Sequence, residues 1–185
     1  MSEPLPINGE NSQQAPEHVN LFSSADVAAI LKENGWLSSE PSEAQSAWCV
    51  RAASLLGPQA QDRAALAGLL RLVFSYDAPN ILQTTEAHVV MSRSAARDVL
   101  RQLALLLLNG MELTTDRFRE VVTQLKEGVD VRSRELFHPL RLALAGRNGE
   151  RELDRVILLL DEAAAADFAV KTARERILEF CSALD

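Results

Sequence analysis

Apolar residues recur every three or four positions from Val27 to Phe180, which is the period of helices with one buried face. Nowhere do four residues alternate between apolar and polar with turn signals on both sides, so we expect no β-strand. Short polar or glycine-containing connections separate the periodic stretches. The pattern predicts an all-α fold, a single compact domain of about eight helices.

Capping residues predict where these helices begin and end. We expect starts at Ser23 or Ser24, Pro41, Pro58, Ser92 or Ser94, and Thr114 or Thr115, and ends near Gly35, Gly57, Asn109-Gly110, Gly128 and Gly146. The segments 136–146, 153–160 and 169–180 supply the last three helices. Between them, Asp77, Pro79 and Asn80 predict a loop from Ser75 to Thr84.

The first 20 residues have a different composition. They hold three prolines, three glutamates and no lysine or arginine, which predicts a disordered acidic tail over residues 1–20. The helical domain is then expected over residues 21–185.

Charge limits the kinds of partner. The chain carries 26 acidic and 19 basic residues, a net charge of −7, and this argues against broad binding to nucleic acid and against DNA as a partner. A local basic face on an acidic body stays possible, since residues 130–155 carry six arginines against five acids. Sixteen of the 19 basic residues are arginine, which suits phosphates and base edges but is equally expected from a GC-rich genome.

Two further features bear on location and chemistry. We find no apolar run long enough to span a bilayer and no signal peptide, so the expected location is the cytoplasm, with no membrane partner. Cys49 and Cys181 lie far apart without the spacing of metal ligands and are expected to be reduced thiols. The histidines are isolated, so we expect neither a metal site nor a cofactor.

The most specific stretch runs from Leu136 to Arg147, with the sequence LFHPLRLALAGR. With the apolar helix 153–160 that follows, it resembles the signature of the C-terminal anticodon-binding domain of bacterial glutamyl-tRNA synthetases, of the class I aminoacyl-tRNA synthetase family. Weaker matches in the same order are the segments 21–36, 47–51 and 118–128.

The resemblance implies an all-α cage that grips the anticodon loop of tRNA. By position it makes Arg141 and Leu153 the residues that contact anticodon bases, and it places Arg51 on a further helix of the cage. The turn after the signature departs from the family, because Glu150 and Arg151 stand where glycine and proline are usual.

Reasoning from the residues adds candidates and leaves alternatives open. Arg147 and Arg151 flank a glycine-containing turn and are either RNA contacts or solvated surface charges. Arg141 either meets a base or phosphate or forms an ion pair with Glu135 or Asp154. The segment Val90–Ser94 resembles a catalytic loop of class I synthetases, but lacks its first lysine, so we interpret it as a helix N-cap.

Together these observations predict a stand-alone tRNA-binding module without a catalytic domain. The candidate RNA-binding residues are Arg141, Arg147, Arg151, Leu153 and Arg51. We expect weak binding to tRNA or other structured RNA, possible action beside a catalytic synthetase, and no enzymatic activity of the chain alone. The alternative is a helical protein-interaction or regulatory module that kept the fold and lost RNA reading.

Overall fold

The computed structural model describes residues 19–185, and the predicted acidic tail lies almost entirely outside this range. The described residues form eleven α-helices and one short 3₁₀-helix with no strand, which confirms the all-α prediction. The helices are α1 (Ser24–Glu33), α2 (Glu43–Leu56), η1 (Gly57–Gln59), α3 (Arg63–Phe74), α4 (Ala78–Leu82), α5 (Thr85–Met91), α6 (Ala96–Leu107), α7 (Thr115–Val129), α8 (Arg134–Ala145), α9 (Arg151–Leu158), α10 (Leu160–Ala165) and α11 (Ala173–Leu184).

Three of these helices were not expected. The predicted loop 75–84 contains α4, whose first turn holds Pro79 and is capped by Asp77. Thr84 then caps α5, and α10 follows α9 after a break at Leu159. The N-cap prediction at Ser92 or Ser94 was wrong, because Ser92 ends α5 and Ala95 precedes α6.

Several other boundaries follow the predicted signals. The Ser23 side chain accepts a hydrogen bond from the Asp26 amide, and the Ser23 amide donates to the Asp26 carboxylate, which together form a capping box that starts α1. The Thr114 side chain accepts a hydrogen bond from the Arg117 amide and so caps α7. Gly146 ends α8 with a φ of 78°, the left-handed conformation that glycine adopts without strain.

Two predicted helix boundaries, at Pro58 and Gly128, differ from those in the structure. Pro58 lies in η1, and Asp62 starts α3 in its place. Gly128 lies inside α7, which ends one residue later at Val129 and is followed by a left-handed Asp130. Asn20, at the end of the predicted tail, donates to the Ala53 carbonyl at 2.9 Å.

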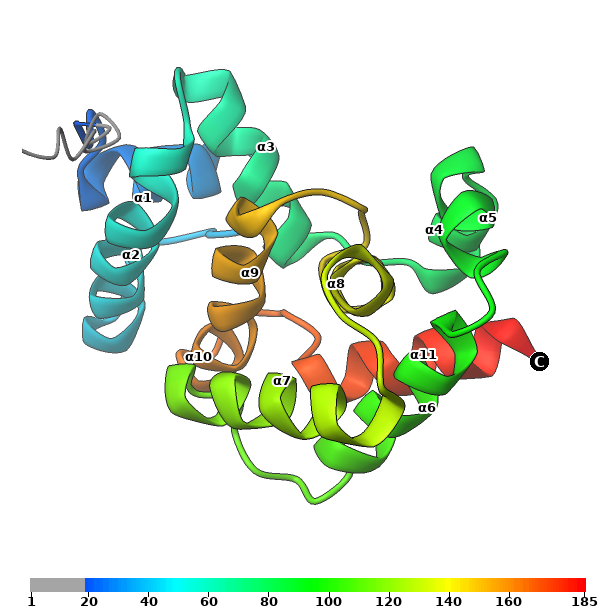
Figure 1. Cartoon of the computed structure of the whole chain (residues 1–185). Coiled ribbons are helices and arrows are strands. Elements are labelled where there is room, and N and C mark those ends of the chain that lie inside the picture. The colour runs from blue at the N-terminus through cyan, green and yellow to red at the C-terminus, as the bar shows by residue number, and fades with distance from the viewer. Residues whose placement is uncertain (1–18) are drawn as a thin grey trace, which may run out of the picture.

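Helix α8 is the centre of the molecule and contacts α5, α6, α9 and α11 (Figure 1). All residues from Pro139 to Ala145 are buried, so this half of the helix has no solvent-facing side. A helix that is buried around its circumference needs neighbours on every side, and this places the signature segment, including Arg141, inside the molecule.

Arg176 on α11 is a fully buried charge beside α8, at 0% exposure. Its guanidinium donates to the carbonyls of Leu72 at 2.8 Å and Leu144 at 2.9 Å, and also to those of Val73 and Lys171. The first three carbonyls lie in the last turns of α3 and α8, which carry partial negative charge. Arg176 therefore joins the C-terminal ends of two helices.

An aromatic cluster surrounds Phe74, the last residue of α3. Trp36 stacks on Phe74 with ring centroids 5.1 Å apart, and Trp48 and Phe168 pack edge-on around them. The indole of Trp48 donates to the Leu159 carbonyl at 3.2 Å. This cluster joins α2 and α3 to the segment that follows α9.

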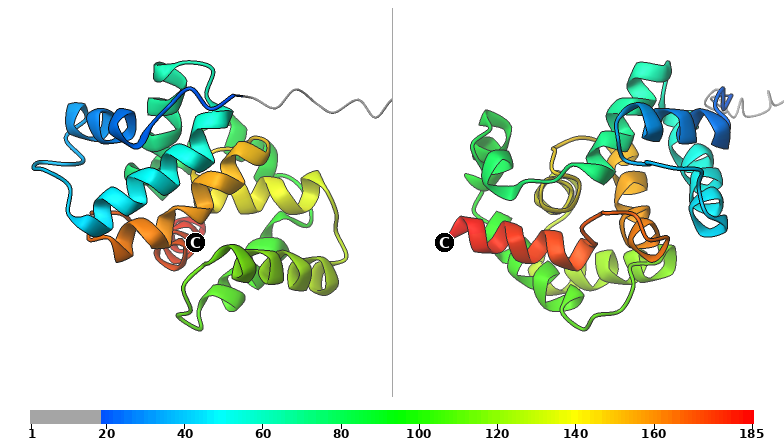
Figure 2. Two further views of the ribbon diagram at one scale, coloured as in Figure 1. Left: turned by 90° about the vertical axis from the view of Figure 1, so that its left-hand side faces the viewer. Right: turned by 180° about the vertical axis from the view of Figure 1, so that it is seen from behind.

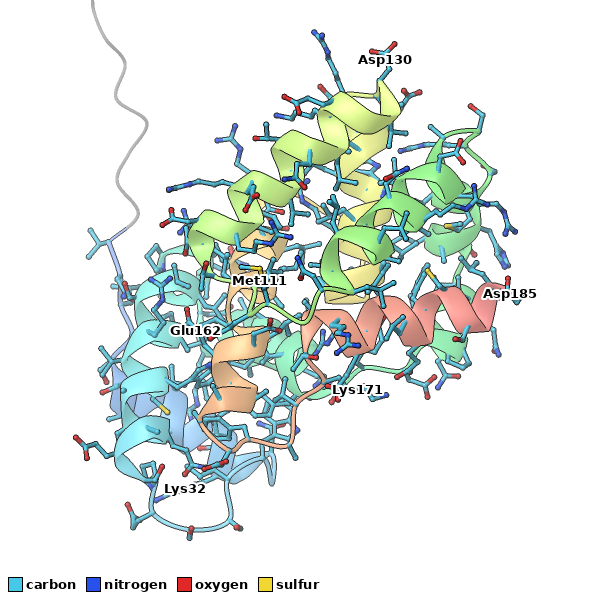
Figure 3. The ribbon with its side chains drawn as sticks, turned by 90° about the horizontal axis from the view of Figure 1, so that it is seen from below. Lys32, Met111, Asp130, Glu162, Lys171 and Asp185 are labelled. Atoms are coloured by element: carbon cyan, nitrogen blue, oxygen red, sulfur yellow. The ribbon has the colours of Figure 1, made fainter. Side chains whose placement is uncertain are left out.

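Asp161 connects two loops that are distant in sequence. Its two carboxylate oxygens accept hydrogen bonds from the amides of Leu113 at 2.7 Å and Ala173 at 2.8 Å. Figure 3 shows the loop at Met111 passing close to Glu162 and to the start of α11. Asp161 thereby fixes the entries to α7 and α11.

No helix among residues 19–185 combines the length and apolar character needed to cross a bilayer. Both cysteines are free, and burial raises the pKa of the Cys49 thiol to about 11.

Candidate nucleic-acid interface

One face of α8 lines a polar pocket of about 470 Å³. Arg134, Phe137, His138 and Arg141 lie three or four residues apart, so helical geometry places them on one side. The end of α7 supplies Lys126, and the start of α9 supplies Glu150, Arg151 and Asp154. The left view of Figure 2 shows α8 and α9 beginning on the side of the molecule where α7 ends.

Arg141 is the most buried of the basic residues that line this pocket. Its side chain is 7% exposed and forms a two-point ion pair with Asp154, at 2.8 Å from Nε and 2.9 Å from Nη2. Nη1 donates to the Gly149 carbonyl at 2.9 Å, and the guanidinium carbon lies 4.8 Å from the centre of the Phe137 ring. Of the ion-pair alternatives that the sequence left open, the structure forms the one with Asp154. Direct contact of Arg141 with RNA stays a prediction.

The pocket is positive within an acidic chain. Lys126, Arg134, Arg141 and Arg151 face Glu150 and Asp154, a balance of four positive against two negative charges. Of the four basic residues, only Arg141 is in an ion pair with any residue of the range 19–185. The net +2 of this lining contrasts with −7 for the whole chain, which makes the pocket a local anion-attracting region.

His138 is held neutral at the edge of the pocket. Burial lowers its pKa below the ordinary 6.5, and the nearby charges of Arg93, Arg134 and Arg141 lower it further. Its Nδ1 lies 2.9 Å from Nη1 of Arg93, a donor, so Nδ1 acts as the acceptor and the proton resides on Nε2. The histidine therefore positions Arg93 and offers no charge of its own near neutral pH.

The predicted RNA-binding residues do not all meet at this pocket. Arg141 and Arg151 line it, whereas Arg147 is exposed in the turn that links α8 to α9. Leu153 is 1% exposed and packs in the core, so its side chain is not accessible to RNA in this structure. Arg51 lies on α2, 3.5 Å from Glu162, and lines a separate shallow depression between α2 and α10.

Sequence reasoning missed Lys126, Arg134 and Phe137 as members of the site. A signal existed for two of them, because Arg134 and Phe137 precede Arg141 by seven and four residues on one helix. Lys126 reaches the pocket only through the turn between α7 and α8, and nothing local in the sequence indicates it. Within residues 19–185 we find no cluster of histidine, cysteine, aspartate or glutamate side chains able to hold a metal ion.

Comparison with known proteins supports the interpretation of the signature helix. The model of the family "Anticodon binding domain" matches residues 20–177. A curated relative, "Glutamate--tRNA ligase 2" from Syntrophus aciditrophicus (strain SB), is 34% identical over 77 residues. That match covers 42% of this chain and 16% of the ligase. No solved structure matches significantly. Because the family match spans most of the chain and the described fold is entirely helical, the chain belongs to the anticodon-binding domain family of glutamyl-tRNA synthetase-like proteins.

Proposed function

We propose that this chain is a tRNA-binding module that holds the anticodon loop at the basic pocket of α7, α8 and α9. The observation that carries the proposal is the net +2 lining of this pocket around the signature helix of an otherwise acidic domain. Such a positive region attracts the phosphates of RNA, and contacts to phosphates supply most of the electrostatic free energy of RNA binding.

The proposal includes a catalytic synthetase as a partner. A curated ligase that resembles this chain over only 16% of its own length supports the idea that the activity belongs to another polypeptide or another region. The cytoplasm, where tRNA is charged, is the expected location.

Titration of a fluorescent anticodon-arm RNA with the protein at low salt tests the proposal. We expect saturable binding with a dissociation constant that is micromolar or weaker, because the net charge of −7 opposes RNA. The control RNA is an acceptor-arm hairpin of equal length and charge, which should bind more weakly. No binding of either RNA at millimolar concentration would refute the RNA function.

A second candidate function, protein interaction, rests on a different surface. An apolar groove of about 260 Å³ lies between α6 and α11, and Leu105 at its edge is 58% exposed. Leu108, three residues after Leu105 at the end of α6, is 41% exposed and extends this apolar strip, whereas Met111 is 61% exposed and lines a separate hollow beside α10. If this strip serves a partner, Leu105→Glu should abolish co-elution with the catalytic synthetase and leave RNA binding unchanged.

A further inference from the structure

Helices α8 and α9 both begin at the basic pocket, and neither start is capped by a side chain. Ser133 precedes α8 and Glu150 precedes α9, and neither side chain accepts a bond from the first-turn amides. Both residues also line the pocket. Uncapped first-turn amides favour an anion, but this alone identifies no ligand. The argument for a ligand comes from the charged side chains between the two helix ends.

Three cationic side chains face the pocket without a carboxylate partner among residues 19–185. Lys126, Arg134 and Arg151 are exposed, and each comes from a different helix. Lys126 approaches only the Phe137 ring, at 5.9 Å from its centre. Long cationic side chains converging on one hollow from three helices suit a compact anion with several acceptor oxygens.

Arg141 differs from these three because its guanidinium is already engaged. Three of its nitrogens donate to Asp154 and Gly149, and one face covers Phe137. Turning toward a base edge would break the two-point ion pair and leave the carboxylate of Asp154 without a partner in a half-buried site. The contacts of Arg141 instead tie the 146–150 turn and the first turn of α9 to α8.

We propose that the pocket binds a phosphate of the RNA backbone, held by the side chains of Lys126, Arg134 and Arg151, while Arg141 reads no base. Arg141 and Asp154 are positioning residues that fix α9 so that Arg151 faces the pocket. This inference rests on the proposed function and names the part of the RNA that the pocket takes. It implies that the pocket gives affinity with little base selectivity.

Variants of the exposed cations test the phosphate contacts without threatening the fold. Arg134→Gln and Arg151→Gln should each weaken binding of the anticodon-arm RNA several-fold and lower the slope of log Kd against log salt by about one. Glu150→Gln removes a repelling carboxylate and should strengthen binding several-fold. The matched control is Arg101→Gln on α6, an exposed arginine outside this pocket, which should change neither quantity. An unchanged slope in both pocket variants would overturn the proposal.

A second experiment separates positioning by Arg141 from direct contact. We expect Arg141→Met and Asp154→Asn to weaken binding to a similar extent, to be non-additive in combination, and to leave the salt slope unchanged. A loss of about one in the slope with Arg141→Met alone would show that Arg141 contacts phosphate itself and would overturn its positioning role. Asp154→Asn keeps the test informative if Arg141→Met does not fold.

Anticodon-arm RNAs that differ in one loop base complete the test. Their affinities should agree within about threefold, since backbone contacts carry no direct sequence information. A tenfold preference for one base that Arg141→Met removes would overturn this inference while the proposed function stands. Inorganic phosphate, at constant ionic strength, should compete only weakly, and competition as strong as that of the RNA would instead show a free-anion site. Absence of any RNA binding would overturn both proposals.

Discussion

At the scale of single residues, Arg176 shows how the fold accommodates a buried charge without a carboxylate partner. No ion pair among residues 19–185 includes it. Its bonds go to backbone carbonyls, three of them at the ends of α3 and α8. Burial lowers its pKa to about 10, which still leaves the side chain charged at neutral pH. The favourable partner of the charge is the negative end of two helix dipoles.

Replacing Arg176 should therefore be costly. Arg176→Met leaves several buried carbonyls without donors, and we expect the free energy of unfolding to fall by about 3 kcal/mol or more. Urea denaturation followed by circular dichroism measures this. Arg174→Met, an exposed arginine two residues earlier on the same helix, is the control and should stay within about 0.5 kcal/mol of wild type. Equal stability of the two variants would contradict this role of Arg176.

His138 should make stability sensitive to mild acid. Its folded-state pKa lies below the ordinary 6.5, so the unfolded chain takes up this proton first as the pH falls. Its contribution is unchanged above about pH 7 and is progressively lost from about pH 6.5 down to the folded-state pKa. His138→Asn keeps an acceptor near Nδ1 and cannot be protonated. We expect wild type to lose more stability than this variant between about pH 7 and pH 5; parallel losses would refute the expectation.

At this scale, the sequence could predict the role of a residue only where its hydrogen-bond partner lies a few residues away along the chain. The caps of α1 and α7 were each narrowed to two adjacent residues, of which the structure uses Ser23 and Thr114, because an N-cap side chain bonds to an amide only three residues ahead. The role of Arg176 was invisible, since Leu72 lies 104 residues away. The engagement of Arg141 by Asp154 was one of two alternatives that spacing alone left open.

At the scale of helices, the glycine at the end of the signature is a requirement of the backbone. Gly146 has a φ of 78°, and a Cβ there would lie 3.0 Å from Cδ1 of Ile81. Gly146→Ala should therefore destabilise the domain by about 1–2 kcal/mol. Gly68→Ala in α3 has open space at the Cβ position and should stabilise by about 0.5–1 kcal/mol.

Thermal or urea unfolding of both variants, measured side by side, separates the two effects. The opposite signs matter more than the magnitudes. A stabilising Gly146→Ala would show that the end of α8 tolerates another conformation.

Long helices with a repeated apolar face were predictable, and short ones were not. The signature helix α8 and its partner α9 were expected because both carry a buried face of several apolar residues. Helices α4 and α5 have five and seven residues, too few for the period to show. The serines at 92 and 94 are chemically suitable caps, yet the chain caps α5 with Thr84 and leaves α6 without a side-chain cap.

At the scale of the molecule, the pocket and the rest of the surface have opposite electrostatic character. The pocket arises only when α7, α8 and α9 come together, so residue counting along 130–155 suggested a slight positive excess but not its location. The family signature lies on α8, which lines the pocket, and the folded chain brings Lys126 of α7 to the same pocket.

The isolated chain should not activate glutamate. The segment Val90–Ser94, which resembles a catalytic loop of class I synthetases, lacks the first lysine of that loop and forms the end of α5 and the turn after it. We expect no ATP–pyrophosphate exchange in a preparation free of host synthetase. Exchange that depends on glutamate and on this protein would contradict the expectation.

The aromatic cluster has a consequence for spectroscopy. Both tryptophans of the chain, Trp36 and Trp48, lie in it, and neither lines the basic pocket. Tryptophan fluorescence should therefore change when packing among α2, α3 and the segment after α9 is lost. It should not change when a ligand only occupies the basic pocket. A shift in tryptophan emission on adding RNA would then have one of two causes. Either α9, which runs from the pocket to the Leu159 carbonyl that accepts from Trp48, has moved, or the RNA contacts the depression that Trp48 lines beside Arg51.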